Sequence, residues 1–183
     1  MTEPDDQLVA RVRAGDREAL GLLFDRYADR VYNHCFRRTA SWDLAEDATS
    51  TVFLDAWRAR TRLQVVGDSA LPYLLGIATN VCRNQARSAR RRLRLAGRVI
   101  AEVDVADHAE QVADGVDSER RMTEVLDAIR SLPRHEQEVL ALIAWDGLTY
   151  EQAAAALGVP IGTVRSRLSR ARARLTRLEG NQS

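Results

Sequence analysis

The stretch GLTYEQAAAALGVPIGTVRSRLSRARARL, residues 147–175, indicates how the C-terminal part of this chain folds. Thr149 and, three residues later, Gln152 form the capping-box pattern that begins a helix. Gly158 favours the left-handed turn that ends this helix, and Pro160 is tolerated only near the start of the next one. A break of about three or four residues predicts a helix-turn-helix whose second helix enters a major groove of duplex DNA.

The second helix has one apolar face and one polar, basic face. At roughly 100° per residue, an apolar stripe is expected to pack inward. Its members are Ile161, Val164, Leu168, Ala171 and Leu175. The opposite face carries Gly162, Arg165, Ser166, Ser169 and Arg170. Arginine and serine side chains can reach guanine edges or phosphates, so this face predicts DNA binding. The alternative is a solvated basic helix in an ordinary helical bundle.

The charge of the chain is segregated rather than large. The 183 residues include 27 basic side chains, all arginine, and 26 acidic ones, so the net charge is only +1. Attraction to DNA must therefore come from local clusters. One cluster without an acid contains Arg83, Arg87, Arg90, Arg91, Arg92, Arg94 and Arg98. No apolar run is long enough to span a bilayer and no export signal begins the chain, so we expect a cytoplasmic protein that is not inserted in a membrane.

The remaining sequence predicts an all-α fold of two small helical domains. Helical periodicity runs from Leu8 to about Arg62, with a break at Gly15 and Asp16 and a helix start at Ser41. A loop with Gly67 and Asp68 precedes a helix started by Pro72. The apolar residues at helical spacing include Leu20, Leu23, Phe24, Tyr27, Val31 and Cys35, followed by Trp42, Leu44, Ala45, Ala48, Val52, Phe53, Ala56 and Trp57 in the next helix. The helix after Pro72 is expected to carry Tyr73, Leu74, Ile77, Ala78, Val81 and Cys82 inward. Residues 96–118 are acidic and aperiodic, which predicts a flexible linker between domains at 1–95 and 119–183.

The order of these parts resembles the extracytoplasmic-function (ECF, group 4) sigma factors, the small two-domain initiation subunits of bacterial RNA polymerase. DLAEDATSTVFLDAW, residues 43–57, looks like region 2.2, and residues 67–92 look like regions 2.3 and 2.4. Residues 126–175 are similar to region 4. The resemblance implies an alternative sigma factor that binds core RNA polymerase and directs initiation at chosen promoters. Family members are often held inactive by an anti-sigma factor, and the sequence leaves open whether this chain has one.

The resemblance also implies which residues contact promoter DNA. The minus-thirty-five element would be read by Arg165, Ser166, Ser169 and Arg170. The single-stranded minus-ten element would be contacted at its bases by Tyr73 and Asn80, and along its backbone by Arg83, Arg87, Arg90 and Arg91. The loop from Gln64 to Leu71 lies where the family places its base-capturing loop. Leu71, Leu75 and Gly76 depart from the family pattern, in which aromatic or basic residues are frequent there. The alternative is that Tyr73 packs in the core and Asn80 is an ordinary surface residue.

A third implied surface binds the polymerase. In the family, the helix that corresponds to residues 43–57 binds the clamp helices of the largest polymerase subunit. The side chains assigned to this contact are Asp43, Glu46, Asp47, Phe53, Asp55 and Trp57. Acidic residues complement a basic partner and speed association. The alternatives are a solvated acidic face and, from a different class, a metal-dependent nucleic-acid enzyme. We set the enzyme aside because no histidine or cysteine accompanies the carboxylates.

Nothing in the sequence predicts catalysis, a metal site or a cofactor. His34, His108 and His135 fall in no metal motif, and Cys35 and Cys82 have no partner at metal-ligand spacing. The cysteines are expected to be buried thiols, and a disulfide between them stays open. A stand-alone helix-turn-helix regulator that binds DNA as a dimer remains the alternative function within the DNA-binding class.

Overall fold

The computed structural model describes residues 3–96, 128–129 and 131–180. These ranges are helical and contain an isolated bridge between Val66 and Ser69, but no strand. The chain divides into two compact units, residues 1–109 and 110–183. The predicted all-α class with two helical domains is therefore confirmed. The linker expected over 96–118 lies outside the described residues, except for Ala96, which is the last residue of a helix.

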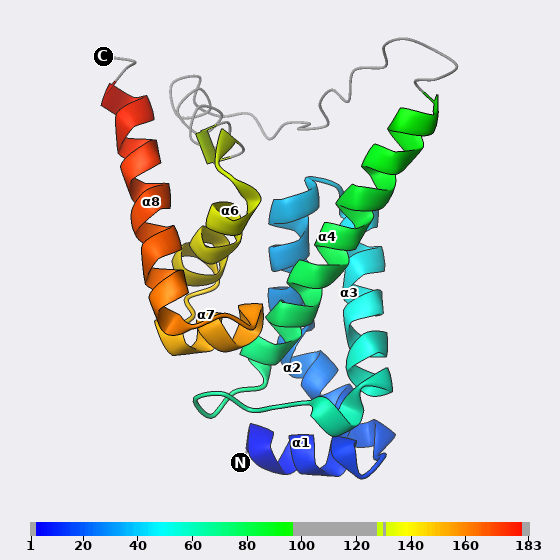
Figure 1. Cartoon of the computed structure of the whole chain (residues 1–183). Helices are drawn as coiled ribbons and strands as arrows, with labels where there is room; N and C mark the ends of the chain where they lie inside the picture. The colour runs from blue at the N-terminus through cyan, green and yellow to red at the C-terminus, as the bar shows by residue number, and fades with distance from the viewer. Residues whose placement is uncertain (1–2, 97–127, 130, 181–183) are drawn as a thin grey trace, which may run out of the picture. The chain divides into compact units, whose positions relative to one another are not determined.

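The first unit is a bundle of three long helices with a short helix across one end (Figure 1). Its elements are α1 (Asp5–Arg13), α2 (Arg17–Thr39), α3 (Trp42–Arg58), a 3₁₀ turn η1 (Arg60–Arg62) and α4 (Leu71–Ala96). Helices α2, α3 and α4 pack against one another, and α1 packs against α2 and η1. The C-terminal part of α4 extends past the ends of α2 and α3 (Figure 1).

The helix boundaries follow from local chemistry. Asp16 caps α2, because its Oδ1 accepts from the backbone N–H of Glu18 at 2.9 Å and of Ala19 at 3.3 Å. Ser41 caps α3 in the same way, with 3.4 Å from its Oγ to the N of Leu44. Between these helices Ala40 adopts the left-handed conformation, with φ of 51°, which glycine adopts more easily. The predicted breaks at Gly15–Asp16 and Ser41 are confirmed.

The core of the first unit is the apolar seam between α2, α3 and α4. Leu23, Val31, Val52, Leu74 and Ala78 are completely or almost completely buried. Two aromatic residues of the apolar helical pattern stay exposed, Phe24 at 43% and Trp42 at 66%. Phe24 lies at the open edge between α2 and α3 and contacts Phe53. Trp42 is the first residue of its helix, and its ring packs on Phe36 and Tyr32 of α2 at ring separations of 4.3 Å and 6.4 Å. Leu44, a member of the same apolar pattern, is 44% exposed.

Polar and sulfur side chains in this core are paired. His34 is buried, and the separation between its Nε2 and Oγ1 of Thr79 is 3.2 Å. Cys35 and Cys82 are buried free thiols, so the disulfide that the sequence left open is not formed. Their mutual hydrogen bond, together with burial, raises the pKa of the Cys35 thiol. These residues therefore hold α2 to α4.

The second unit contains the predicted helix-turn-helix. Its described elements are α6 (Arg134–Leu140), a π-helical turn η2 (Ala141–Trp145), α7 (Tyr150–Leu157) and α8 (Ile161–Gly180). Thr149 and Gln152 form both bonds of the capping box, and Gly158 has φ of 63°, so these predictions are confirmed. Val164, Leu168 and Ala171 are buried as expected, and Leu175 is half-buried. Ile161 is more exposed than expected, because it is the first residue of α8.

A buried carboxylate joins α6 to α8. Glu136 is 1% exposed, and its Oε2 lies 3.2 Å from Nε of Arg174. The partly exposed His135 ring lies 3.7 Å from the other carboxylate oxygen. Removing one member of such a pair leaves an uncompensated charge, so Arg174 belongs to the scaffold of this unit rather than to its outer face.

None of the helices described is both long enough and apolar enough to traverse a lipid bilayer.

Candidate functional site

The outer face of α8 is a row of exposed polar and basic side chains. Arg165, Ser166, Ser169 and Arg170 are all exposed, and Val164 and Leu168 lie buried behind them. The helix that precedes α8 ends at Gly158, and Pro160 leads directly into the new helix. This turn orients the polar face of α8 away from the core. All four predicted side chains of this face are therefore together and accessible.

The two arginines of this face are held before any ligand binds. The guanidinium of Arg165 lies over the ring of Tyr150 at 5.9 Å from its centroid, within the range of a cation–π contact. Arg170 donates from Nε to the carbonyl of Ser166 at 3.1 Å and from Nη2 to its Oγ at 3.4 Å. The Oγ of Ser166 in turn donates to the Thr163 carbonyl at 3.1 Å.

Tyr150 was missed by the sequence analysis. It is the first residue of α7, and only the crossing of α7 and α8 brings its ring to Arg165. A carboxylate is close by as well, because the pKa of Glu151 is lowered by a backbone N–H, by the hydroxyl of Thr149 and, to a smaller extent, by Arg165. These neighbours favour one position of the Arg165 guanidinium.

A second basic face runs along α4. Helical geometry places Tyr73, Asn80, Arg87 and Arg91 within about 40° of one another around the helix. Asn80 is exposed, and its Oδ1 accepts from Nη1 of Arg83 at 3.0 Å. Four exposed arginines border a shallow hollow of about 380 Å³, namely Arg87, Arg90, Arg91 and Arg94. The residues predicted for the minus-ten element thus lie on one helix, with the aromatic and amide near its start and the arginines beyond.

Tyr73 lies at the border between core and surface. Its side chain is half-buried, and burial raises the pKa of its phenol, with a smaller opposing influence from Arg62. Leu71, Leu75 and Gly76, the three departures from the family pattern, are buried. Those positions are therefore part of the core in this chain, and Tyr73 is the aromatic of the first turn of α4 that keeps an exposed part.

The loop from Gln64 to Leu71 makes a tight turn next to this face. The backbone N–H of Val66 donates to the Ser69 carbonyl at 2.9 Å. Gly67 and Asp68 between them have φ of 57° and 61°. Two consecutive left-handed residues define a type I′ geometry, which glycine and aspartate adopt more readily than most residues. Both tip residues are exposed, so the loop presents a defined turn to solvent.

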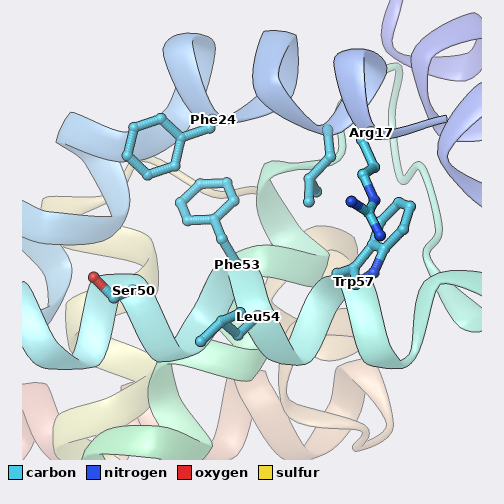
Figure 2. A pocket seen from close by; sticks show the side chains of 7 residues that line it. Arg17, Phe24, Ser50, Phe53, Leu54 and Trp57 are labelled. Atoms are coloured by element: carbon cyan, nitrogen blue, oxygen red, sulfur yellow. The ribbon is translucent and has the colours of Figure 1, made fainter.

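An apolar groove of about 280 Å³ lies between α2 and α3 (Figure 2). The lining residues are Arg17, Leu20, Phe24, Ser50, Phe53, Leu54 and Trp57. The rings of Phe24 and Phe53 meet edge to face, with centroids 4.8 Å apart. The Trp57 ring lies under the guanidinium groups of Arg17 at 6.0 Å and of Arg60 at 5.0 Å.

The predicted acidic residues extend one face of α3 beyond this groove. Asp43, Glu46 and Asp47 are exposed. Asp43, Asp47 and Leu54 lie within about 40° of one another around the helix, so carboxylates and groove form one continuous strip. Asp55 points elsewhere, because it lies about 100° away from Leu54 and pairs with Arg58 at 3.3 Å. Among the described residues, no group of three potential metal ligands comes together.

Five groove residues were not predicted as site residues: Arg17, Leu20 and Phe24 on α2, and Ser50 and Leu54 on α3. Leu54 is 54% exposed, and its position seven residues after Asp47 is a signal that the helical-face argument could have used. The α2 residues carry no such signal, because only the packing of α2 on α3 makes them part of the same surface.

Comparison with known proteins identifies the family. Residues 23–92 match the family described as Sigma-70 region 2, and residues 122–175 match Sigma-70, region 4. The ECF RNA polymerase sigma-E factor of Escherichia coli strain K12 is 33% identical over 92% of this chain and 90% of its own length. The ECF RNA polymerase sigma factor BldN of Streptomyces coelicolor is 30% identical over 94% of this chain, which spans 64% of BldN.

A solved structure shows the same relationship. The sigma factor RpoE of Bartonella quintana, crystallised with the anti-sigma factor NepR, is 27% identical and superposes with a TM-score of 0.63 over 86% of this chain and 94% of that one. The two matched regions occur in the order region 2, then region 4, and the Escherichia coli relative matches along 90% of its own length. These findings all indicate the same family. The chain therefore belongs to the ECF sigma factors, and it is an alternative sigma factor that directs transcription initiation with RNA polymerase.

Proposed function

We propose that three surfaces of this chain divide the work of promoter recognition. The groove and acidic strip of α3 bind core RNA polymerase, the polar and basic face of α4 takes the minus-ten strand, and the outer face of α8 reads the minus-thirty-five element. The observation that carries this division is the presence of an exposed arginine-rich helix on each of the two units.

The polymerase contact is supported by the composition of its surface. An apolar groove lined by Phe53, Leu54 and Trp57 provides area that a partner can bury. The flanking carboxylates Asp43, Glu46 and Asp47 steer a basic partner surface towards it. The exposed rim pairs contribute little affinity by themselves, so the groove supplies most of the binding free energy.

The minus-ten contact is supported by the order of side chains along α4. A released base can stack on the exposed part of Tyr73 or accept and donate hydrogen bonds with Asn80. Arg83, Arg87, Arg90 and Arg91 then follow the phosphates of the same strand. The half-buried state of Tyr73 supports a contact at one edge of its ring rather than full stacking.

The minus-thirty-five contact is supported by the geometry of α8. Arg165 and Arg170 can each donate two hydrogen bonds to one guanine, and Ser166 and Ser169 can contact base edges or phosphates. Loss of a bidentate pair costs about 1–3 kcal/mol and relaxes the preference at one base. For Arg170→Ala we expect the affinity for a promoter duplex selected by the holoenzyme to fall about fivefold or more, and the affinity for a scrambled duplex to fall much less.

A matched control for Arg170→Ala is available on the same helix. Arg177→Ala removes an exposed arginine about 10 Å further along α8. It should lower affinity equally on both duplexes. Equal losses for Arg170→Ala would make Arg170 a phosphate contact instead.

The proposal extends to partners and context. We propose that the chain belongs to group 4 of the sigma factors, acts in the cytoplasm, has no catalytic activity and uses no cofactor. The complex of the Bartonella quintana relative with NepR supports an anti-sigma factor as a further partner. A protein that covered the α3 groove or the α8 face would keep this chain from polymerase or from DNA.

Transcription in vitro tests the proposed function as a whole. Purified core polymerase and this chain are supplied with promoters selected by the reconstituted holoenzyme from a randomised library. Initiation at discrete start sites that depends on this chain supports the proposal. Metal-dependent DNA cleavage without polymerase would require the nucleic-acid enzyme, and a symmetric dimer on duplex without initiation would favour the stand-alone regulator.

A further inference from the structure

A buried carboxylate in the first helix reaches the loop that precedes α4. Asp5 is 4% exposed and lies in the first turn of α1. Its Oδ2 accepts from the hydroxyl of Tyr27 at 2.5 Å and from the backbone N–H of Ala70 at 2.6 Å. Its Oδ1 pairs with the guanidinium of Arg26. One side chain thus connects α1, α2 and the loop.

The hydroxyl of Tyr27 extends this connection into the loop. It lies 2.9 Å from Oγ of Ser69, and the same Oγ accepts from the backbone N–H of Leu71 at 3.1 Å. Burial, followed by the bond to Asp5, raises the pKa of the Tyr27 phenol, so this hydroxyl is a neutral donor at physiological pH. The end of the loop is therefore held through both Ala70 and Ser69.

The other end of the loop is held by the last residue of the same helix. Arg13 donates from Nε to the carbonyl of Leu63 at 2.9 Å and from Nη2 at 2.5 Å. Both ends of the segment between Leu63 and Ala70 are thus bonded to α1, and the exposed turn at Gly67 and Asp68 lies between them.

Burying the carboxylate of Asp5 costs free energy, which indicates that this side chain has a role besides packing. A carboxylate removed from water needs partners for both oxygens, and the partners of Asp5 on α2 and in the loop satisfy it only in one arrangement of the loop. Binding sites gain affinity and selectivity when their loops are fixed before the ligand arrives. The bonds of Asp5 and Tyr27 to Ser69 and Ala70, here called the lock, fix the base of the exposed turn in this way.

We propose that α1 positions the loop Gln64–Leu71 for capture of a minus-ten base, with Asp5 and Tyr27 as the positioning residues. They touch no DNA. They act by holding Ser69 and Ala70, so they determine how strongly one base of the non-template strand is held and distinguished. The inference rests on the proposed binding of the minus-ten strand and on the base-capturing role that the family resemblance implies for this loop.

The test measures the contribution of each minus-ten base to holoenzyme binding. Fork-junction promoters carry an abasic site at one non-template position at a time, and the affinity ratio of intact to abasic DNA is determined for each position. Because this is a ratio for one protein preparation, a smaller folded fraction does not change it. In the wild type we expect one position where the ratio reaches about tenfold.

Two variants weaken the lock from opposite sides. Asp5→Asn removes the charge and one acceptor, and Tyr27→Phe removes a single hydroxyl from a ring that stays in place. Both should lower the ratio at the captured position to about threefold or less while the ratios elsewhere stay unchanged. If Asp5→Asn fails to fold, Tyr27→Phe decides the question.

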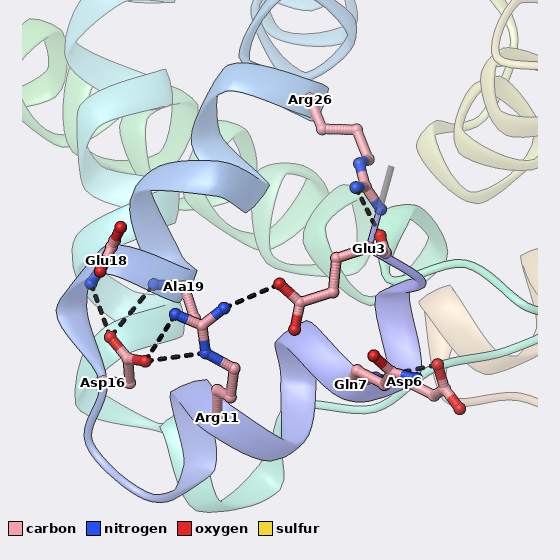
Figure 3. Close-up of polar contacts among 8 residues, drawn as sticks. All are labelled: Glu3, Asp6, Gln7, Arg11, Asp16, Glu18, Ala19 and Arg26. Atoms are coloured by element: carbon pink, nitrogen blue, oxygen red, sulfur yellow. Dashed lines mark hydrogen bonds and ion pairs between the residues drawn. The ribbon is translucent and has the colours of Figure 1, made fainter. Parts of the chain in front are cut away.

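The matched control is Asp6→Asn on the same helix. Asp6 is exposed, and its carboxylate accepts from the N–H of Gln7 at 2.9 Å (Figure 3). The Asp6→Asn variant should keep the wild-type affinity ratio of intact to abasic DNA at every position. Unchanged ratios in Asp5→Asn and Tyr27→Phe, or equal losses at every position, would overturn the inference and leave base capture by the loop intact. A wild type without any sensitive position would show instead that the loop captures no base.

Discussion

Replacing Leu54 by alanine tests whether the groove between α2 and α3 is the polymerase contact. Leu54 is 54% exposed on α3, so much of this apolar side chain adds little to the stability of the free protein. It lines the groove together with Phe53 and Trp57 (Figure 2). A partner that fills the groove would cover the exposed half of this side chain.

The expected loss follows from that exposed fraction. Complete burial of a leucine side chain contributes about 1.5–3 kcal/mol, so burial of the exposed half contributes about 1–1.5 kcal/mol. This corresponds to a rise of about five- to tenfold in the Kd for core polymerase. The free energy of unfolding should change by no more than about 0.5 kcal/mol, because surface substitutions rarely do more.

The assay compares binding with stability in the same variants. Anisotropy of the dye-labelled full chain, titrated with purified core polymerase, gives the Kd, and thermal unfolding gives the stability. Leu22→Ala is the control, since Leu22 is 40% exposed on α2 but does not line the groove. The reasoning is refuted if Leu54→Ala binds within twofold of the wild type, or if Leu22→Ala weakens binding equally.

Three further predictions concern helix ends, each checked by denaturant or thermal unfolding of the full chain. Ala40→Gly should stabilise the chain by about 0.5–1 kcal/mol, because φ of 51° suits glycine. Gly158→Ala should destabilise it by about 1 kcal/mol, because alanine is strained at φ of 63° although the space around the new methyl is open. Effects of the opposite sign would contradict the assigned conformations. Thr149→Ala should cost about 1 kcal/mol through loss of the capping box, and Thr149→Ser should restore most of it. The pKa of Asp16 is lowered by Arg11 and by the backbone N–H groups that it caps, so its contribution to stability is present above about pH 4 and is lost as the pH falls; Asp16→Asn should flatten this dependence.

Much of the local structure could be predicted because its signals lie a few residues apart. The break at Gly15 and Asp16, the caps at Ser41 and Thr149 and the stop at Gly158 are each confirmed. The prediction of burial was less reliable at a helix end. Ile161 illustrates this, since it fits the apolar stripe of α8 but is 36% exposed as the first residue of that helix.

The candidate sites were predictable to different degrees. The face of α8 follows from helical spacing alone, because Arg165 and Arg170 must point away from a helix side that carries Val164 and Leu168. The support that Tyr150 gives to Arg165 did not follow from spacing, because it depends on how α7 crosses α8. Phe24 joined the groove between α2 and α3 for the same reason, through the packing of α2 on α3.

The amino-acid sequence was enough to predict that this chain is helical, where several of its helices begin or end, and that its parts stand in the order of an ECF sigma factor. These properties depend on helix caps and on helical periodicity, which involve residues of a single helix only a few positions apart. The tertiary structure alone decided that Asp5 holds Ala70, 65 residues away, and that two helix faces form one groove. A lone carboxylate or phenylalanine carries no sign of its distant partner, because that partner is chosen by the packing of whole helices.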